Sequence, residues 1–254
     1  MTSSGTATDR RRPRITHLVL VDGLPADHWV EEGADAAHLV PGRGAAGPRA
    51  RVAELATDLE RRDHERSWLE ALVGGPDALA ALDAEPLPPR LFTLPDLGPD
   101  LGPAGAPAVA ARAIAIGAEC DRIATEVFDD AELGAALRRL WEAALAIDPA
   151  MLVRSSRDDT AVGALVWVTL QANGLLGATG RMLARELWPR LGVPASAAGR
   201  GAALLERLAP GSGLLVPPPG APRLRATGRS DVLLASTRRL LVQRRDELRD
   251  EFSA

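Results

Sequence analysis

The sequence predicts a mostly α-helical protein: a helical bundle with a degenerate winged helix-turn-helix, preceded by a small N-terminal region with one or two strands. Apolar residues make up 46% of the 254 residues, which is enough for a buried core, whereas aromatic residues make up only 3% and tyrosine is absent. Ala, Leu and Val must therefore fill most of the core, and Ala and Leu are good helix formers. Apolar residues also recur at helical intervals through the second half of the chain, which favours helices there.

The N-terminal part of the chain divides into a tail and the beginning of a small α/β region. Residues 1–14 are expected to be a disordered tail. The β-branched and apolar run Ile15–Gly23 ends in Asp-Gly, which predicts one buried strand followed by a turn. A short helix is expected near Asp27–Glu32, and a loop rich in Gly and Pro follows it. These elements begin the predicted α/β region, which covers residues 15–85.

A stronger helical pattern and a clear interruption complete the first half of the chain. A helix is expected from Pro48, because apolar residues recur at helical intervals until Gly74-Gly75 ends the pattern. Another short helix is expected over Asp77–Leu82. The segment 86–107 then contains so much Pro and Gly that neither a helix nor a central strand is expected, and we interpret it as a linker.

Residues 108–254 form the predicted helical domain. Asp148-Pro149 ends one of its helices, because the backbone before a proline disfavours the helical conformation. The helix from Ala161 is apolar nearly all round, which predicts the buried centre of the bundle. Gly213–Val216 and Arg223–Ala226 are expected to be two short strands of a wing on either side of the sequence PPPGAP. The expected helices span residues 110–128, 131–147, 161–175, 182–190, 195–208 and 232–249.

A candidate helix-turn-helix lies within residues 181–208, in the sequence LARELWPRLGVPASAAGRGAALLERL. Gly192 stands where the chain must turn sharply, and leucines on both sides of it are placed to hold two helices together. In a DNA-binding interpretation the second helix would enter the major groove. A purely structural helical hairpin remains an equally open interpretation. The candidate nucleic-acid-binding residues are Arg181, Arg185, Arg190, Ser196, Arg200 and Arg207.

The composition of this motif favours contacts with phosphate over reading of bases. Pro189 removes a backbone hydrogen bond inside the first helix, and Gly199 and Gly201 weaken the second by about 1 kcal/mol each. Only Ser196 and Arg200 are placed to hydrogen-bond a base edge, whereas base readout normally uses three or four such side chains. Guanidinium groups suit phosphate, so we expect salt-sensitive binding with weak sequence specificity.

Three segments carry a resemblance to other proteins: FDDAELGAALRRLWEAALAIDP, DDTAVGALVWVTLQANGLLG and LARELWPRLGVPASAAGRGAALLERL. Together they span about Cys120 to Leu208, which resembles a family of uncharacterised bacterial helical proteins with a C-terminal helix-turn-helix. The stretch is also remotely similar to the cyclin-like repeats of transcription factor B. The resemblance implies the fold and no known activity. In that family the second helix carries more Ser, Thr and Arg than it does here.

The charge distribution supports two explanations. All 30 basic residues are arginine, and the formal net charge is −4. Residues 151–245 contain 14 arginines and 5 acidic residues, a balance of +9, so the rest of the chain carries −13. Such an asymmetry indicates either a polyanionic partner or pairing between the two halves of the same molecule. The arginines Arg238, Arg239, Arg244 and Arg245 of the last helix fit both explanations.

Catalytic and metal-binding patterns are weak. The sequence contains no nucleophile motif, and a Walker A motif is impossible because lysine is absent. The single Cys120 stands at a helical core position and is expected to be a buried structural thiol. The four histidines, His17, His28, His38 and His64, have acidic neighbours but match no ligand spacing. We therefore expect no catalytic residue, cofactor or metal, although a small metal-dependent enzyme stays open as a minor hypothesis.

The expected location and function follow from these observations. No apolar stretch suited to a signal peptide follows the basic N-terminus, and the most apolar window, residues 161–177, is shorter than the roughly 20 residues of a spanning helix. We expect a cytoplasmic protein with no membrane association. The leading hypothesis is a DNA-associated regulatory protein that binds double-stranded DNA mainly through phosphate. The alternative is a helical scaffold or protein-interaction module with an acidic protein partner, and the oligomeric state is left open.

Overall fold

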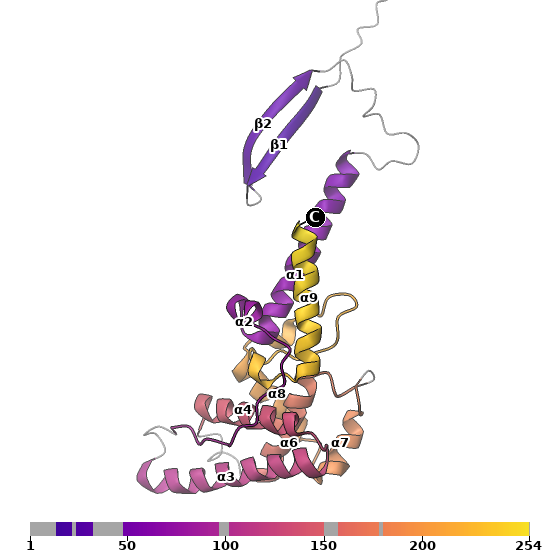
Figure 1. The fold of residues 1–254 in the computed structure, drawn as a ribbon. Helices are drawn as coiled ribbons and strands as arrows, with labels where there is room; N and C mark the ends of the chain where they lie inside the picture. Colours follow the sequence, from indigo (N-terminus) through magenta and orange to yellow (C-terminus); the bar gives the residue numbers. More distant parts are fainter. Residues whose placement is uncertain are drawn as a thin grey trace, which may run out of the picture. The chain divides into compact units, whose positions relative to one another are not determined.

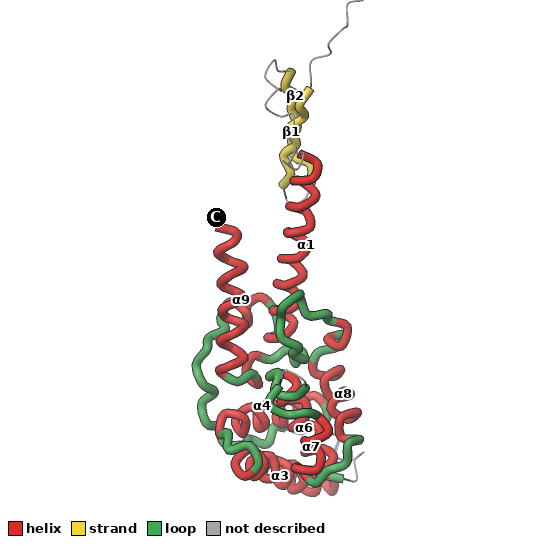
Figure 2. Tube along the Cα trace, turned by 90° about the vertical axis from the view of Figure 1, so that its right-hand side faces the viewer, coloured by secondary structure: helices red, strands yellow, loops and turns green. Residues whose placement is uncertain are grey.

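A computed structural model describes residues 14–21, 24–32, 48–96, 102–149, 157–177 and 180–253 (Figure 1). The chain divides into two compact units, Met1–Leu59 and Glu60–Ala254. Helices account for nearly all the regular structure of the second unit, as Figure 2 shows. The predicted mostly α-helical character is therefore confirmed.

The first unit contains an antiparallel hairpin of β1 (Arg14–Val21) and β2 (Leu24–Glu32). Arg14 pairs with Glu32 and His17 with Trp29, and the register is irregular between Val19 and Leu20. The short helix expected near Asp27–Glu32 is therefore wrong. Pairing with β1 supplies a ladder of backbone hydrogen bonds, and this tertiary context outweighs a weak local helix preference. The expected Asp-Gly turn, residues 22–23, lies outside the described residues.

Helix α1 (Pro48–Val73) begins in the first unit, and from Glu60 onward it belongs to the second. It ends at the predicted Gly74-Gly75, where both residues have positive φ angles of 103° and 116°. A Cβ atom on Gly74 would overlap the carbonyl oxygen of Gly228, so only glycine fits there. Helix α2 (Pro76–Ala80) follows directly, in agreement with the short helix expected over residues 77–82.

Two long helices and an extended segment form the next part of the second unit. Residues 83–96 are irregular, and helix α3 (Gly102–Glu126) begins within the segment 86–107 that we interpreted as a linker. The expectation of no helix is therefore wrong for residues 102–107. Pro103 lies in the first turn, where the N–H groups have no intrahelical partner, whereas Pro107 lies inside the helix. Helix α4 (Ala131–Ile147) starts at Asp130, whose side chain accepts a hydrogen bond from the N–H of Leu133 at 2.9 Å.

Helix α6 (Asp158–Ala172) is the centre of the main core, as its apolar sequence predicted. Every side chain from Ala161 to Leu170 is buried except the half-buried Trp167. Helices α3, α4 and α8 all pack against it. Trp141 of α4 is fully buried beside it, and its indole N–H donates to the carbonyl oxygen of Ala113 at 2.9 Å.

The C-terminal part consists of α7 (Ala184–Leu191), α8 (Ala197–Leu208), the 3₁₀ turns η3 (Ser212–Leu214) and η4 (Ser230–Val232), and α9 (Ala235–Ser253). A second core cluster joins Trp68 and Leu72 of α1 to Leu233 and to Leu241 of α9. Among the described residues, no helix is both long enough and apolar enough to cross a lipid bilayer.

The two strands predicted for a wing are not formed. Residues 215–229 are irregular, and no strand is present over Gly213–Val216 or Arg223–Ala226. Gly213 and Leu214 belong instead to the 3₁₀ turn η3. The N–H of Arg225 bonds instead to the carbonyl oxygen of Gln171, at 3.2 Å, at the end of α6. The loop is thus tied to a helix end and not to a partner strand.

Candidate functional site

Helices α7 and α8 follow one another in the chain and are joined by a tight turn at Gly192; we call the two helices and their turn the hairpin. This glycine has a φ angle of 65°, in the left-handed region that favours glycine. The N–H groups of Gly192 and Val193 bond back to the carbonyl oxygens of Pro189 and Trp188, each at 3.3 Å. Of the five leucines expected to join the two helices, Leu208 is half-buried and the other four are buried, namely Leu187, Leu191, Leu204 and Leu205. The sequence therefore predicted the turn and the burial of these leucines, but they belong to the main core, and α8 packs chiefly against α6 and not against α7.

Small residues let α8 approach α6 closely. A Cβ atom on Gly201 would lie 2.5 Å from Cε3 of Trp167 and 3.2 Å from the carbonyl oxygen of Ala164. A Cβ atom on Gly163 of α6 would lie 2.9 Å from the side chain of Ala197. From the sequence, Gly201 was expected only to weaken the second helix. In the structure, its lack of a side chain allows α8 to pack closely against α6.

Three of the predicted contact residues are arginines whose guanidinium groups have no carboxylate partner among the described residues. Arg181, Arg185 and Arg190 are exposed, and none makes a side-chain hydrogen bond or ion pair within the described part of the chain. The acidic residue of α7, Glu186, is engaged by its own helix, since its carboxylate accepts from the N–H of Leu183 at 3.0 Å. Ser196 is also exposed, at the start of α8, and its hydroxyl caps no backbone N–H. These guanidinium groups are open to solvent and to an anionic partner.

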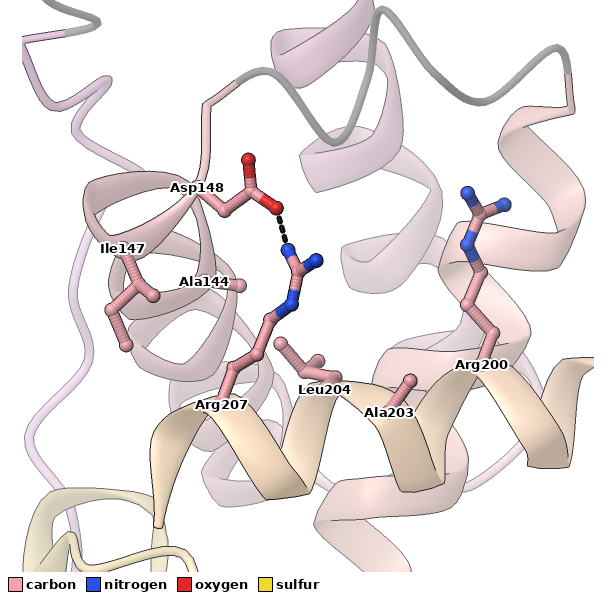
Figure 3. Close-up of a pocket in the computed structure, with 7 residues that line it drawn as sticks. All are labelled: Ala144, Ile147, Asp148, Arg200, Ala203, Leu204 and Arg207. Atoms are coloured by element: carbon pink, nitrogen blue, oxygen red, sulfur yellow. Dashed lines mark ion pairs between the residues drawn. The ribbon is translucent and has the colours of Figure 1, made fainter. Parts of the chain in front are cut away.

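The other two predicted contact residues, Arg200 and Arg207, line a pocket of about 200 Å³ between α8 and the C-terminal end of α4 (Figure 3). Their side chains rise from the same side of α8, above an apolar wall that includes Leu204. Arg207 forms an ion pair with Asp148, which caps the end of α4. The Arg207 charge is therefore neutralised within the molecule, in contrast to those of Arg181, Arg185 and Arg190.

The basic cluster of α9 is also satisfied largely inside the molecule. Arg244 pairs with Glu65 of α1 at 2.5 Å. Arg245 pairs with Asp246 at 2.9 Å, and it donates to the carbonyl oxygen of Leu82 at 2.8 Å. Arg238 pairs with Asp83. Of the two explanations for the charge asymmetry, pairing with the earlier half of the chain thus accounts for Arg238 and Arg244, whereas the carboxylate partner of Arg245 lies on α9 itself.

Sequence reasoning did not single out Arg223 and Arg225 as site residues. Both are exposed and, among the described residues, neither has a side-chain hydrogen bond or ion pair. The sequence did contain a signal that could have identified them, because no acidic residue occurs between Glu206 and Asp231. Arginines in such a stretch have no carboxylate neighbour in sequence, so their charge stays available unless the fold brings an acid to them.

The side chains that a metal site would use are not brought together in the described ranges of the chain. Within the part of the chain that the structure describes, no three His, Cys, Asp or Glu side chains lie close enough to share a metal ion. His64 is exposed on α1, whereas His38 lies outside the described residues. Cys120 is buried, as predicted, and burial raises the pKa of its thiol far above the ordinary value. Such a thiol is a poor nucleophile.

The arrangement thus offers exposed cations on a helical scaffold. Comparison of the chain with models of known protein families, with curated proteins and with solved structures finds no match. Function has to be inferred from the side chains themselves, and unpaired guanidinium groups are suited to bind phosphate or carboxylate oxygens.

Proposed function

We propose that this protein is a DNA-associated regulatory protein, in which the α7–α8 hairpin acts as a helix-turn-helix that contacts the phosphates of double-stranded DNA. The observation that carries the proposal is the division of the arginines. Those of α9 are largely paired with carboxylates of the same chain, whereas Arg181, Arg185 and Arg190 of the hairpin are exposed and unpaired within the described residues. Displacement of counterions from DNA by such groups drives sequence-independent binding.

Sequence specificity is expected to be weak. The exposed positions of α8 include Gly199, Ala202 and Ala203, which carry no hydrogen-bonding side chain. Glu206 is exposed as well, but its carboxylate accepts from the N–H of Gly211 at 3.0 Å and would repel phosphate. Specific readout in the major groove needs several donors and acceptors on that face. The hairpin therefore suits a protein that binds duplex DNA through the sugar-phosphate backbone of the DNA.

Fluorescence anisotropy with a labelled duplex of mixed sequence tests this proposal. Binding should be detectable at low salt, and three phosphate contacts should make log K fall with log salt with a slope of about −3. The triple variant Arg181→Gln, Arg185→Gln, Arg190→Gln should abolish most of the affinity and flatten the slope.

A matched control is available on α9. Arg239 is exposed and, like the hairpin arginines, has no side-chain partner among the described residues, so Arg239→Gln removes a comparable charge elsewhere. It should leave binding close to that of the unchanged protein, whereas Arg185→Gln alone should weaken it. No retention of duplex at low salt, or equal losses for Arg185→Gln and Arg239→Gln, would overturn the proposal.

One observation favours the alternative, a protein-interaction module. The small residues exposed on α8, Gly199, Ala202 and Ala203, would let a helix of a partner approach closely. Chemical cross-linking and size-exclusion chromatography in the absence of nucleic acid test this function. A complex that forms without DNA and is disrupted by Ala202→Glu would support it, and a monomer that is unaffected by Ala202→Glu would count against it.

A further inference from the structure

A large groove lies beside the proline-rich loop, away from the pocket of Arg200 and Arg207. It has a volume of about 900 Å³, within the range of sites for small organic ligands. We call it the proline-loop groove. Its described lining includes Leu176, Leu215, Val216, Arg223 and Arg225.

Backbone contacts hold the loop in place. The N–H of Ala221 bonds to the carbonyl oxygen of Pro218 at 3.0 Å, which closes a tight turn at Gly220. The carbonyl oxygen of Gly220 in turn accepts from Arg244 of α9 at 2.9 Å. At the other end of the loop, Arg225 is tied to α6 through Gln171. The prolines restrict the backbone further, so the groove is largely preformed and a ligand would lose little free energy in ordering it.

The charge of the groove has one sign. Arg223 and Arg225 are exposed lining residues without a side-chain partner among the described residues, and the described lining contains no acidic residue. The carboxylate of Glu206, near Ser212 of the lining, is already engaged by the N–H of Gly211. Two guanidinium groups without a competing carboxylate are complementary to an oxyanion.

The remaining wall is apolar. Leu176 and Leu215 contribute to it, and the Val216 side chain is 66% exposed, which leaves its apolar surface open to a ligand. An exposed apolar surface beside unpaired cations fits a ligand that has both an apolar part and a negative charge. Inorganic phosphate would use only the cations, and a neutral apolar molecule would use only the wall.

We propose that the proline-loop groove binds a small organic anion with an apolar body, whose phosphate or carboxylate group is held by Arg223 and Arg225 while its body lies against Leu215 and Val216. This site goes beyond the proposed DNA binding and does not depend on it. The hairpin arginines contribute nothing to the lining, so the two functions can fail separately.

Isothermal titration calorimetry on the full chain tests the proposal with four probes. Adenosine monophosphate and 1-naphthoate each combine a flat body with an oxyanion, a phosphate in the first and a carboxylate in the second. Adenosine lacks the charge, and inorganic phosphate lacks the body. At least one of the first two should bind one per chain, about tenfold or more tighter than adenosine and inorganic phosphate. The tighter of the two identifies the oxyanion.

Variants locate the binding. The double variant Arg223→Gln, Arg225→Gln should lower the affinity for the probe by about tenfold or more, and Val216→Ser should lower that affinity by a smaller factor. Arg239→Gln is the matched control and should leave the affinity unchanged. All substituted side chains are exposed, and circular dichroism checks that each variant is folded. The proposal is overturned if neither probe binds at millimolar concentration, if inorganic phosphate binds as tightly, or if binding survives the double arginine variant.

Discussion

The guanidinium group of Arg238 lies 3.0 Å from the carboxylate of Asp83, a residue 155 positions earlier in the chain. Arg238 is only 8% exposed, whereas the Asp83 side chain is 64% exposed. A second nitrogen of Arg238 donates to the carbonyl oxygen of Glu85. One buried cation at the beginning of α9 thus holds the segment that follows α2.

The two partners of this ion pair should contribute unequally to stability. Arg238→Ala removes a buried side chain together with its bond to the Glu85 carbonyl, and we expect a loss of about 2–4 kcal/mol in the free energy of unfolding. Asp83→Asn changes an exposed carboxylate, and solvent screening limits its effect to about 1 kcal/mol or less. Urea unfolding followed by circular dichroism measures both. Equal losses would show that the pair acts as a surface salt bridge.

A second long-range connection centres on Glu132, in the first turn of α4. One of its carboxylate oxygens accepts from the N–H of Leu87 at 2.9 Å and from the N–H of Ala235 at 2.8 Å. Glu132→Ala would leave two backbone N–H groups without a partner, and we expect a cost of about 2–4 kcal/mol. Glu132→Gln keeps an acceptor oxygen in place but removes the negative charge that lies 3.7 Å from Arg238, so it should cost less than Glu132→Ala without being neutral. If urea unfolding gives the same midpoint for the two variants, the acceptor role is refuted.

These connections mark the limit of what sequence could predict about the fold. Helix α6 was predictable because the information is local: its apolar residues surround the helix, and acidic residues begin it. The partners of Glu132, Leu87 and Ala235, are 45 and 103 residues away, and periodicity carries no signal for such pairs. Strand β2 was missed for the same reason, since its structure depends on pairing with β1.

The site shows the same division. The turn at Gly192 and the exposed arginines of α7 follow from local pattern and composition. The ion pair that neutralises Arg207 depends on Asp148, which the end of α4 brings to α8. A count of charges gives the balance of a segment, but only tertiary contacts decide which arginines stay available. Arg223 and Arg225 are candidate binding residues because they line the groove, and their spacing in the sequence does not predict this.

The beginning of α6 gives a prediction for pH. Arg157 donates to the carboxylate of Asp159 at 3.1 Å, and together with the N–H of Thr160 it lowers the pKa of Asp159 to about 2. Because the folded pKa is depressed, the contribution of this carboxylate to stability is present above pH about 4, the pKa of an unperturbed Asp, and is lost as the pH falls through 2. Its exposure makes that contribution small.

The measurement is a titration of the Asp159 carboxyl carbon by NMR. Arg157→Gln removes the largest cause of the shift and should raise the pKa of Asp159 toward its ordinary value. Arg239→Gln, far along the sequence on α9, should leave it unchanged. A pKa near 4 in the unchanged protein would show that the Arg157–Asp159 pair does not persist in solution.

The two glycines of α8 should respond to the same substitution with opposite signs. Gly199 is exposed, and nothing lies within 4 Å of a Cβ atom placed on it. Gly199→Ala should therefore raise the free energy of unfolding by up to about 1 kcal/mol, because alanine is the better helix former. Gly201→Ala makes the same gain in helix propensity, but its methyl group would meet Trp167 at 2.5 Å.

Overpacking at Gly201 should outweigh that gain and destabilise the protein by about 1–3 kcal/mol, since the Trp167 ring or α8 itself has to move. Thermal unfolding compares the two variants, and tryptophan fluorescence should change only in Gly201→Ala. Because the packing of α8 against α6 sets the geometry of the hairpin, Gly201→Ala should also weaken the binding of duplex DNA, whereas Gly199→Ala should not. If Gly201→Ala is as stable as Gly199→Ala, then α6 and α8 do not pack at the distance described.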